Sequence, residues 1–286
     1  MVKNLGIVGA GTMGSEIALL ASLSNVNVQL FDVNETILRR SLERIKGILR
    51  KMVNLGKLPA EELTAVLEHI RTRTSLPDLG NCDCIIESVI EDLRVKKDLF
   101  KHLDANTKSS AILASTTSSL SITSIASLTQ NPGRVIGMHF FNPVATASLV
   151  EVVKGHKTNT ETTEQTVAFT NLLGKTSIIV KDTPGFIASR VSLPFYSEAL
   201  RLLGENVADA GQIDKIVKLI GSFATGPFEA LDQMGIDSML ADMNSLYEQS
   251  FGEPRLRPHP ILNKMAESGL LGKKSGKGFY NYEESN

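Results

Sequence analysis

The sequence predicts a Rossmann-type α/β fold, a doubly wound and mostly parallel sheet, followed by a smaller all-helical domain. Three observations predict it. Strand-like and helix-like segments alternate over the first two-thirds of the chain, a glycine-rich turn joins the first strand to the first helix, and strand patterns stop near residue 183. Such alternation is typical of a parallel sheet covered by helices on both faces.

The individual elements follow from the spacing of apolar residues. Short apolar runs indicate strands, whereas longer runs with apolar residues three and four positions apart indicate helices. We expect strands over residues 3–8, 26–31, 84–88, 111–115, 135–141, 149–153 and 177–180. We expect helices over residues 13–23, 35–55, 59–69, 93–103 and 161–173.

A domain boundary is expected at Thr183-Pro184-Gly185, where this alternation ends. Beyond it the patterns are helical, over residues 187–203, 210–220, 228–249 and 260–268. The chain therefore divides into residues 1–183 and 184–286, in agreement with its length. The second domain has little internal volume for its apolar content, so we expect it to bury surface against a second copy in a homodimer.

Composition excludes several classes of function. The apolar content of 42%, the charged content of 21% and the net charge of −1 are ordinary for a globular protein and do not favour nucleic acid or anionic membrane as a partner. No apolar run approaches the roughly 18 residues of a membrane span, and the opening segment does not fit a signal peptide, so a cytoplasmic location is expected. Cys82 and Cys84 are too few for a metal site and are expected to be buried, reduced thiols.

The glycine-rich turn has the GxGxxG spacing of a dinucleotide-binding loop, and it lies between a strand and a helix as that motif requires. Gly9 permits a tight turn, Gly11 lets the backbone approach a pyrophosphate, and Gly14 lets helix and strand pack closely. The helix N-terminus then favours the phosphates. The expected phosphate site is Gly9, Ala10, Gly11, Thr12, Met13 and Gly14.

Asp32 ends the second predicted strand, VNVQLFD. A carboxylate at this place accepts hydrogen bonds from the ribose hydroxyls of adenosine and repels a 2′-phosphate. The sequence therefore predicts NAD rather than NADP as the cofactor. The alternative is a glycine-rich turn followed by an ordinary loop aspartate.

A candidate proton-transfer pair lies in residues 134–153, RVIGMHFFNPVATASLVEVV. Two strand-like runs each contain one ionisable group, His139 in the first and Glu151 in the second, and the chain can turn between them at Asn142-Pro143. A carboxylate on the far ring nitrogen would fix the histidine tautomer and raise its basicity. The alternative is a buried structural histidine and a glutamate on a solvated strand face.

These motifs resemble those of the L-3-hydroxyacyl-CoA dehydrogenase family, in particular its short bacterial members that act on 3-hydroxybutyryl-CoA. The resemblance runs nearly end to end. It also includes ESVIEDLRVKKDLF at 87–100, STTSSLSIT at 115–123, DTPGFIASRV at 182–191, GPFEALDQMGID at 226–237 and GLLGKKSGKGFYNY at 269–282. It implies a nucleotide-binding domain, a helical domain for dimerisation, a substrate cleft, and hydride transfer between NAD and C3 of a short-chain acyl-CoA.

The resemblance also implies roles for single residues. His139 would take the proton of the 3-hydroxyl group, Glu151 would hold His139, and Ser118 would hydrogen-bond the reacting oxygen. Asn142 would contact the substrate, and Ser189 would join the catalytic residues through its own contact with the substrate. The cofactor would further touch Glu91, Lys96, Ser118 and Lys277. For Ser118 the alternative is the N-cap of the helical run that follows it.

Basic residues along the predicted helix 35–55 and just past it suit the phosphates of CoA. They are Arg39, Arg40, Arg44, Lys46, Arg50, Lys51 and Lys57. The alternative is a solvated helix face. Because the family binds CoA near this helix, Lys51 and Lys57 are the expected contacts.

The chain departs from the family pattern at three positions. Ser189 replaces the asparagine of PGF-x-x-N-R, Thr116 replaces the asparagine of SNTSS, and Ser148 replaces the lysine before LVEV. These changes keep two other functions open: a dehydrogenase of a free hydroxy acid, or a non-catalytic NAD-binding relative.

Overall fold

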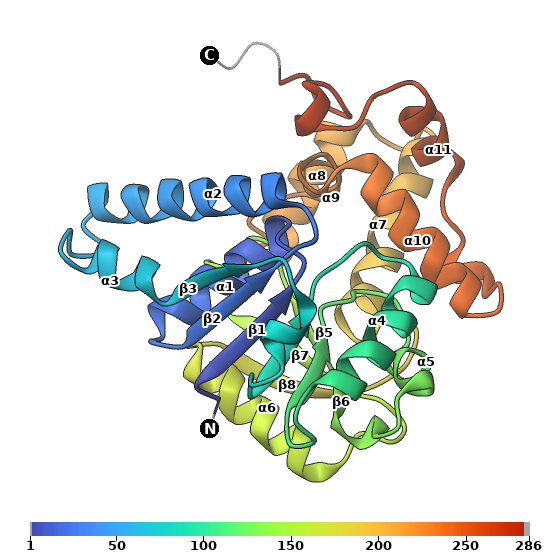
Figure 1. Cartoon of the computed structure of the whole chain (residues 1–286). Helices are drawn as coiled ribbons and strands as arrows, with labels where there is room; N and C mark the ends of the chain where they lie inside the picture. Colours follow the sequence, from blue (N-terminus) through green and yellow to red (C-terminus); the bar gives the residue numbers. More distant parts are fainter. Residues whose placement is uncertain (1, 283–286) are drawn as a thin grey trace. The chain divides into compact units, whose positions relative to one another are not determined.

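The computed structural model describes residues 2–282 and divides into two compact units, residues 1–183 and 184–286. The N-terminal unit contains an eight-stranded sheet in the order β3-β2-β1-β4-β5-β6-β7-β8 (Figure 1). Its strands are β1 Asn4–Val8, β2 Asn27–Phe31, β3 Ile70–Arg73, β4 Cys84–Glu87, β5 Ile112–Ser115, β6 Val135–Phe140, β7 Leu149–Lys154 and β8 Thr176–Lys181. The predicted Rossmann-type, mostly parallel sheet is confirmed.

One strand pair in this sheet is antiparallel. Strands β3, β2, β1, β4, β5 and β6 are parallel, whereas β7 is antiparallel to β6, and β8 is parallel to β7. The loop 141–148 between β6 and β7 is shorter than the crossover of about a dozen residues that a parallel pair needs. The chain therefore turns back on itself at this loop.

Strand β3 is absent from the sequence prediction. Its sequence IRTR lacks a clear apolar alternation, and the strand lies at the edge of the sheet, next to β2. An edge strand has one neighbour and needs less apolar surface than a central strand. Pairing with β2 therefore stabilises β3 as a strand, although its own sequence pattern does not indicate one.

Helices cover both faces of the sheet (Figure 1). They are α1 Thr12–Leu23, α2 Glu35–Asn54, α3 Glu62–Glu68, α4 Leu93–Asn106, α5 Ile122–Ile125 and α6 Thr160–Leu172. Alternate strand residues such as Ile136 and Met138 join one core with α1, α2, α3 and α6. The residue between them, Gly137, faces the other way, because a Cβ there would lie 2.9 Å from the Ile122 side chain of α5. His139 shares the face of Gly137.

The C-terminal unit is helical, and its described residues form no named strand. Its helices are α7 Ala188–Gly204, α8 Ala210–Gly221, α9 Pro227–Met234, α10 Ile236–Gln249 and α11 Pro260–Glu267. Its core contains Leu200, Phe228, Leu231 and Leu262, all fully buried.

The single helix predicted over residues 228–249 is wrong. Two helices, α9 and α10, occupy this range, and Gly235 separates them. Gly235 has a φ of +97°, a conformation that interrupts a right-handed helix and favours glycine. The apolar spacing continues across the break, so periodicity alone does not reveal it.

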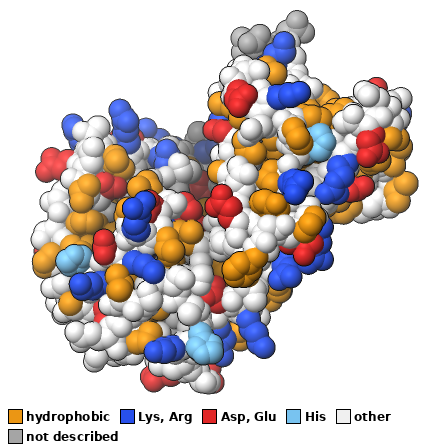
Figure 2. Space-filling model, turned by 90° about the vertical axis from the view of Figure 1, so that its right-hand side faces the viewer, with side chains coloured by type: hydrophobic (Ala, Val, Ile, Leu, Met, Phe, Trp, Pro, Cys, Tyr) orange, Lys and Arg blue, Asp and Glu red, His pale blue; other side chains and the backbone are white. Residues whose placement is uncertain are grey.

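The surface carries charges of both signs. On the face drawn in Figure 2, lysine and arginine side chains are interspersed with aspartate and glutamate. This mixture agrees with the net charge of −1. Within residues 2–282, no helix is both long and apolar enough to cross a bilayer.

A buried ion pair stabilises the end of α4. The side chains of Arg134 and Asp104 are each 5% exposed and lie 2.7 Å apart, and Arg134 also donates to the carbonyl oxygens of Lys108 and Ala111. Since a buried guanidinium needs its counter-charge, Asp104→Asn should lower the free energy of unfolding by about 3 kcal/mol. Urea unfolding followed by circular dichroism measures this loss.

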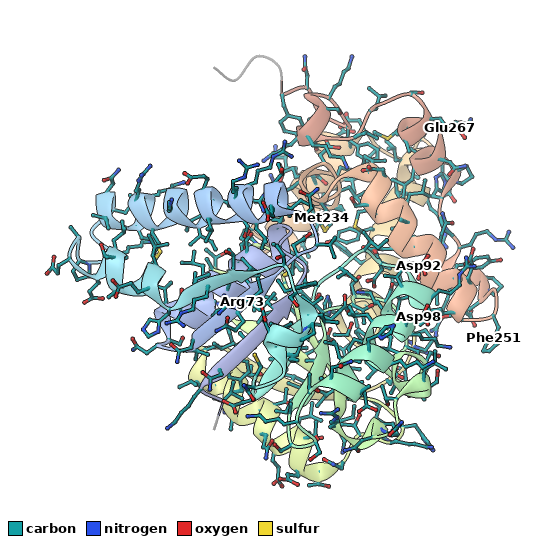
Figure 3. All side chains as sticks on the ribbon, in the orientation of Figure 1. Arg73, Asp92, Asp98, Met234, Phe251 and Glu267 are labelled. Carbon is teal, nitrogen blue, oxygen red and sulfur yellow. The ribbon has the colours of Figure 1, made fainter. Side chains whose placement is uncertain are left out.

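The control for this variant is Asp98→Asn. Asp98 lies on the exposed face of the same helix (Figure 3), and no ion pair joins it to another described residue. Its substitution should leave stability within about 0.5 kcal/mol of the unsubstituted protein. Equal losses in the two variants would contradict a specific role for the buried pair.

Candidate functional site

Several predicted site residues of the N-terminal unit, the glycine loop and His139 and Glu151 among them, lie at one edge of its sheet. The carboxyl ends of the parallel strands β1, β4, β5 and β6 meet there, which is where ligands bind in open α/β sheets. The antiparallel β7 begins at the same edge. Residues that are far apart in sequence therefore become neighbours, namely the glycine loop after β1, Glu87, the turn after Ser115, His139 and Glu151.

Protein atoms fill the space beside Gly9 and Gly14 in the glycine loop but leave the space beside Gly11 open. A Cβ on Gly9 would lie 2.3 Å from the Ser88 carbonyl oxygen, and one on Gly14 would lie 2.0 Å from the Gly9 carbonyl oxygen. A Cβ on Gly11 would meet no protein atom within 4 Å. The bare backbone at Gly11 therefore leaves room for a group outside the protein, as a pyrophosphate cradle does.

Asp32 lies beside this loop. Its carboxylate accepts hydrogen bonds from the backbone N–H groups of Ala10 and Asn34, both at 3.0 Å. The backbone N–H of Asp32 donates to the carbonyl oxygen of Arg73, the residue that ends β3 (Figure 3). Near it is a cavity of about 310 Å³, lined by Glu35, Leu38, Arg39, Leu42, Thr72, Arg73 and Thr74. This arrangement fits an adenosine whose ribose is held by Asp32.

A buried ion pair lies at the ends of β4 and β5. The Lys96 ammonium is 1% exposed and lies 2.6 Å from the carboxylate of Glu87, which is fully buried. That carboxylate also accepts hydrogen bonds from the Ser115 hydroxyl at 2.6 Å and the Val89 N–H at 2.7 Å. The second contact of Lys96 is Glu91, at 3.1 Å. Lys96 thus joins the predicted cofactor contact Glu91 to the buried core.

Glu91 also holds in place the turn after β5, which carries Ser118. The hydroxyl groups of Thr117 and Ser119, which flank Ser118, both donate to the Glu91 carboxylate. The helix that follows is capped by Ser121, whose side chain accepts the Ser124 N–H. Ser118 is therefore not the N-cap, and the capping interpretation of Ser118 is wrong.

His139 and Glu151 contact each other, as the sequence predicts. His139 on β6 and Glu151 on β7 stand directly opposite each other, and Nδ1 of His139 lies 2.6 Å from Oε2 of Glu151. Their side chains are 9% and 2% exposed. A short contact between two buried side chains fixes the orientation of the imidazole ring. The Phe141 ring packs against His139 at a centroid distance of 4.6 Å.

Other predicted contacts in this unit are exposed. Asn142 follows the histidine strand and is exposed, and Lys51 and Lys57 are exposed at and just past the end of α2. Exposure leaves the lysines able to bind a ligand phosphate, but it equally fits a solvated helix face. Thr116 is half-buried, and its N–H donates to the carbonyl oxygen of Glu87, whereas Ser148 is exposed.

Two predicted residues belong to the C-terminal unit. Ser189 is the second residue of α7 and is half-buried. Lys277 is exposed on the closing segment, where its carbonyl oxygen accepts the Gly272 N–H. Asp232, which is fully buried, anchors this segment by accepting the backbone N–H groups of Phe279 and Tyr280.

Sequence reasoning missed the supporting residues Glu87, Ser115 and Thr117. The signal for Glu87 was present, because an acidic residue in the apolar run CIIES resembles the pattern around His139. No sequence pattern around Glu87 indicates that Lys96 is its partner. Cys82 and Cys84 are buried free thiols as predicted, and burial raises the pKa of Cys82 to about 11.

Comparison with known proteins covers both units. Residues 4–183 match the family described as 3-hydroxyacyl-CoA dehydrogenase, NAD binding domain, and residues 185–282 match its C-terminal domain. The chain is 40% identical over 283 residues to the probable 3-hydroxybutyryl-CoA dehydrogenase of Bacillus subtilis, covering 99% of this chain and 98% of that protein. It is 40% identical to human mitochondrial hydroxyacyl-coenzyme A dehydrogenase, covering 99% and 92%.

A solved structure extends the likeness to three dimensions. The (S)-3-hydroxybutyryl-CoA dehydrogenase of Ralstonia eutropha superposes with a TM-score of 0.95 at 36% identity, covering 99% of this chain and 100% of that one. The likeness therefore includes the helical unit as well as the sheet with the glycine loop.

The open space at Gly11 yields a test of the cofactor loop. Gly11→Ala should lower the melting temperature by only about 2–4 °C, because its φ of −67° suits alanine and no protein atom is displaced. NADH affinity, measured by fluorescence, should fall at least about tenfold, since the new methyl group occupies the pyrophosphate position.

Gly14→Ala is the contrasting variant. Its methyl group would meet the Gly9 backbone at 2.0 Å, so both the melting temperature and NADH binding should fall. Unchanged NADH binding by Gly11→Ala would show that the loop does not hold the cofactor.

Proposed function

This chain belongs to the 3-hydroxyacyl-CoA dehydrogenase family of NAD-dependent enzymes, and on that premise we propose that it interconverts short-chain L-3-hydroxyacyl-CoA and 3-ketoacyl-CoA with His139 as the general base and acid. The observation that carries the proposal is the buried contact of 2.6 Å between His139 and Glu151. It lies at the sheet edge that also holds the glycine loop. A proton acceptor and a cofactor site on one sheet are what alcohol oxidation needs.

The proton transfer follows from these positions. Oxidation of a secondary alcohol removes a hydride from carbon and a proton from oxygen. When bound, NAD accepts the hydride on its nicotinamide ring. His139 takes the hydroxyl proton on Nε2 while Glu151 holds Nδ1 and stabilises the imidazolium. In the reductive direction, the same imidazolium returns the proton to the substrate oxygen.

We propose that the Ser118 hydroxyl donates a hydrogen bond to the substrate oxygen that reacts. Ser118 is half-buried, and the contacts of its two neighbours with Glu91 hold its turn in place. A hydroxyl group held in this way donates a hydrogen bond that strengthens as charge develops on the substrate oxygen. Asn142 and Ser189 are the further substrate contacts in this proposal, and Lys277 is a further cofactor contact.

The CoA part of the substrate is assigned to the end of α2. Lys51 and Lys57 are exposed there and can pair with the 3′-phosphate and the pyrophosphate. Their exposure also implies strong screening by salt. A free hydroxy acid would not need these lysines, so protection of the protein by CoA alone separates the two substrate classes.

The direct test supplies acetoacetyl-CoA and NADH and follows the loss of NADH absorbance. His139→Ala should lower kcat by about 10²–10⁴-fold, because the variant has no group to donate the proton. NADH affinity should remain within a few-fold of that of the unsubstituted protein. The matched control is His156→Ala, since His156 is exposed and lies outside the His139–Glu151 pair.

Two results would contradict this proposal. One is the absence of turnover with every 3-ketoacyl-CoA tested, which would favour a free hydroxy acid substrate or a non-catalytic NAD-binding role. The other is full activity of His139→Ala.

We also propose that the helical unit forms a homodimer through α7 and α8. Large apolar side chains are exposed on these two helices, namely Val191 and Phe195 on α7 and Ile216, Leu219 and Ile220 on α8, with Phe223 just after α8. The rings of Phe195 and Phe223 lie 5.7 Å apart, which makes the surface continuous. A contiguous apolar surface of this kind is typical of a subunit interface.

The variant Leu219→Asp/Ile220→Asp should convert a dimer to a monomer, because each charge would have to be buried in the interface. Light scattering coupled to size-exclusion chromatography measures the molar mass. Leu128→Asp is the control, an exposed leucine in the N-terminal unit that should leave the mass unchanged. A monomeric unsubstituted protein would contradict the proposed dimer.

A further inference from the structure

The loop 141–148 joins the two strands that carry His139 and Glu151. It contains the exposed Asn142 and begins with Phe141, whose ring packs on His139. The position of this loop therefore decides what surrounds the histidine. Two charged side chains from distant parts of the N-terminal unit bind its backbone.

The first is Lys175, between α6 and β8. Its side chain is buried, with the residue 8% exposed, and its ammonium donates to the carbonyl oxygens of Val144 at 2.7 Å, Ala147 at 2.8 Å and Ala145 at 3.5 Å. Burial lowers the pKa of Lys175. No carboxylate among residues 2–282 forms an ion pair with it. The loop carbonyls thus take the place of a counter-charge.

The second is Glu16, on the first helix. Its carboxylate accepts the backbone N–H of Val144 at 2.8 Å. Val144 is itself 1% exposed, so one buried residue is bound on its N–H side by an anion and on its C=O side by a cation. Charge-assisted hydrogen bonds of this kind are roughly twice as strong as neutral ones.

Glu16 connects this loop to the cofactor site. It lies in the first turns of α1, which begins at Thr12 directly after Gly11. The helix that presents its N-terminus to the pyrophosphate is therefore hydrogen-bonded to the loop that follows the histidine strand. Alcohol oxidation removes hydride and proton from adjacent atoms, so the two acceptors must keep a fixed relative position.

We propose that Lys175 and Glu16 are positioning residues that hold the loop 141–148, and with it the surroundings of His139, in register with the cofactor helix. This inference rests on the proposed role of His139. Neither residue touches the reacting atoms in this proposal. Both act through Val144 and the backbone that leads to Phe141.

The test compares Lys175→Met with the unsubstituted protein in acetoacetyl-CoA reduction. Methionine keeps most of the side-chain volume but leaves the three carbonyl oxygens without a donor. We expect kcat to fall about 10–100-fold, the effect of a displacement of roughly 1 Å, while the Kd for NADH changes less than about threefold. Lys181→Met is the matched control, because Lys181 is an exposed lysine at the end of β8.

Glu16 gives a second and milder test. Glu16→Gln keeps an oxygen that can accept the Val144 N–H, whereas Glu16→Ala removes it. The alanine variant should lose about tenfold in kcat. The glutamine variant should recover most of that loss and Glu16→Met should not, because methionine restores the side-chain volume without an oxygen acceptor. These variants keep the proposal testable if Lys175→Met does not fold.

Hydrogen exchange separates this inference from the proposed function. Peptides that contain residues 141–148 should exchange faster in Lys175→Met and Glu16→Ala than in the unsubstituted protein, with no substrate present. Unchanged exchange and unchanged kcat would overturn the positioning role. Faster exchange in a protein whose native form reduces no 3-ketoacyl-CoA would support the anchoring of the loop and reject the assigned reaction.

Discussion

The buried ion pair of Glu87 and Lys96 fixes the part of the sheet on which the site depends. Both groups are almost completely removed from water, so separating them would leave an uncompensated charge in the interior. Glu87 also binds Ser115, which ties the ends of β4 and β5 to α4. Through Lys96 and Glu91 the same network reaches the turn that presents Ser118. The sheet edge that carries the candidate site thereby gains a rigid support.

The reversal of the chain at β7 adds the second half of the site. A parallel β7 would begin at the opposite edge of the sheet, far from the carboxyl end of β6. The short loop 141–148 prevents this arrangement and sets Glu151 opposite His139. The carboxylate and the imidazole then meet on the sheet face that Gly137 shares, away from the core that contains Ile136 and Met138.

The sequence predicted the fold well in segments where one local feature, such as apolar spacing or a glycine motif, determines the structure. The strand–helix alternation, the glycine loop, and the facing positions of His139 and Glu151 all follow from neighbours in sequence. Predictions failed where a tertiary contact or a single backbone angle decided the outcome. Gly235 interrupts a continuous apolar pattern by its positive φ, and Ser121 rather than Ser118 caps α5.

Motif spacing and apolar periodicity are properties of contiguous residues, and they suffice to identify the class of fold, the family and the NAD cofactor. The support of the site depends instead on contacts between distant segments. The partners of Glu87 and Lys175 come from segments distant in sequence, and a buried charge takes whichever groups the packed strand ends bring within hydrogen-bond distance. That choice depends on topology and register, which no local pattern of residues specifies.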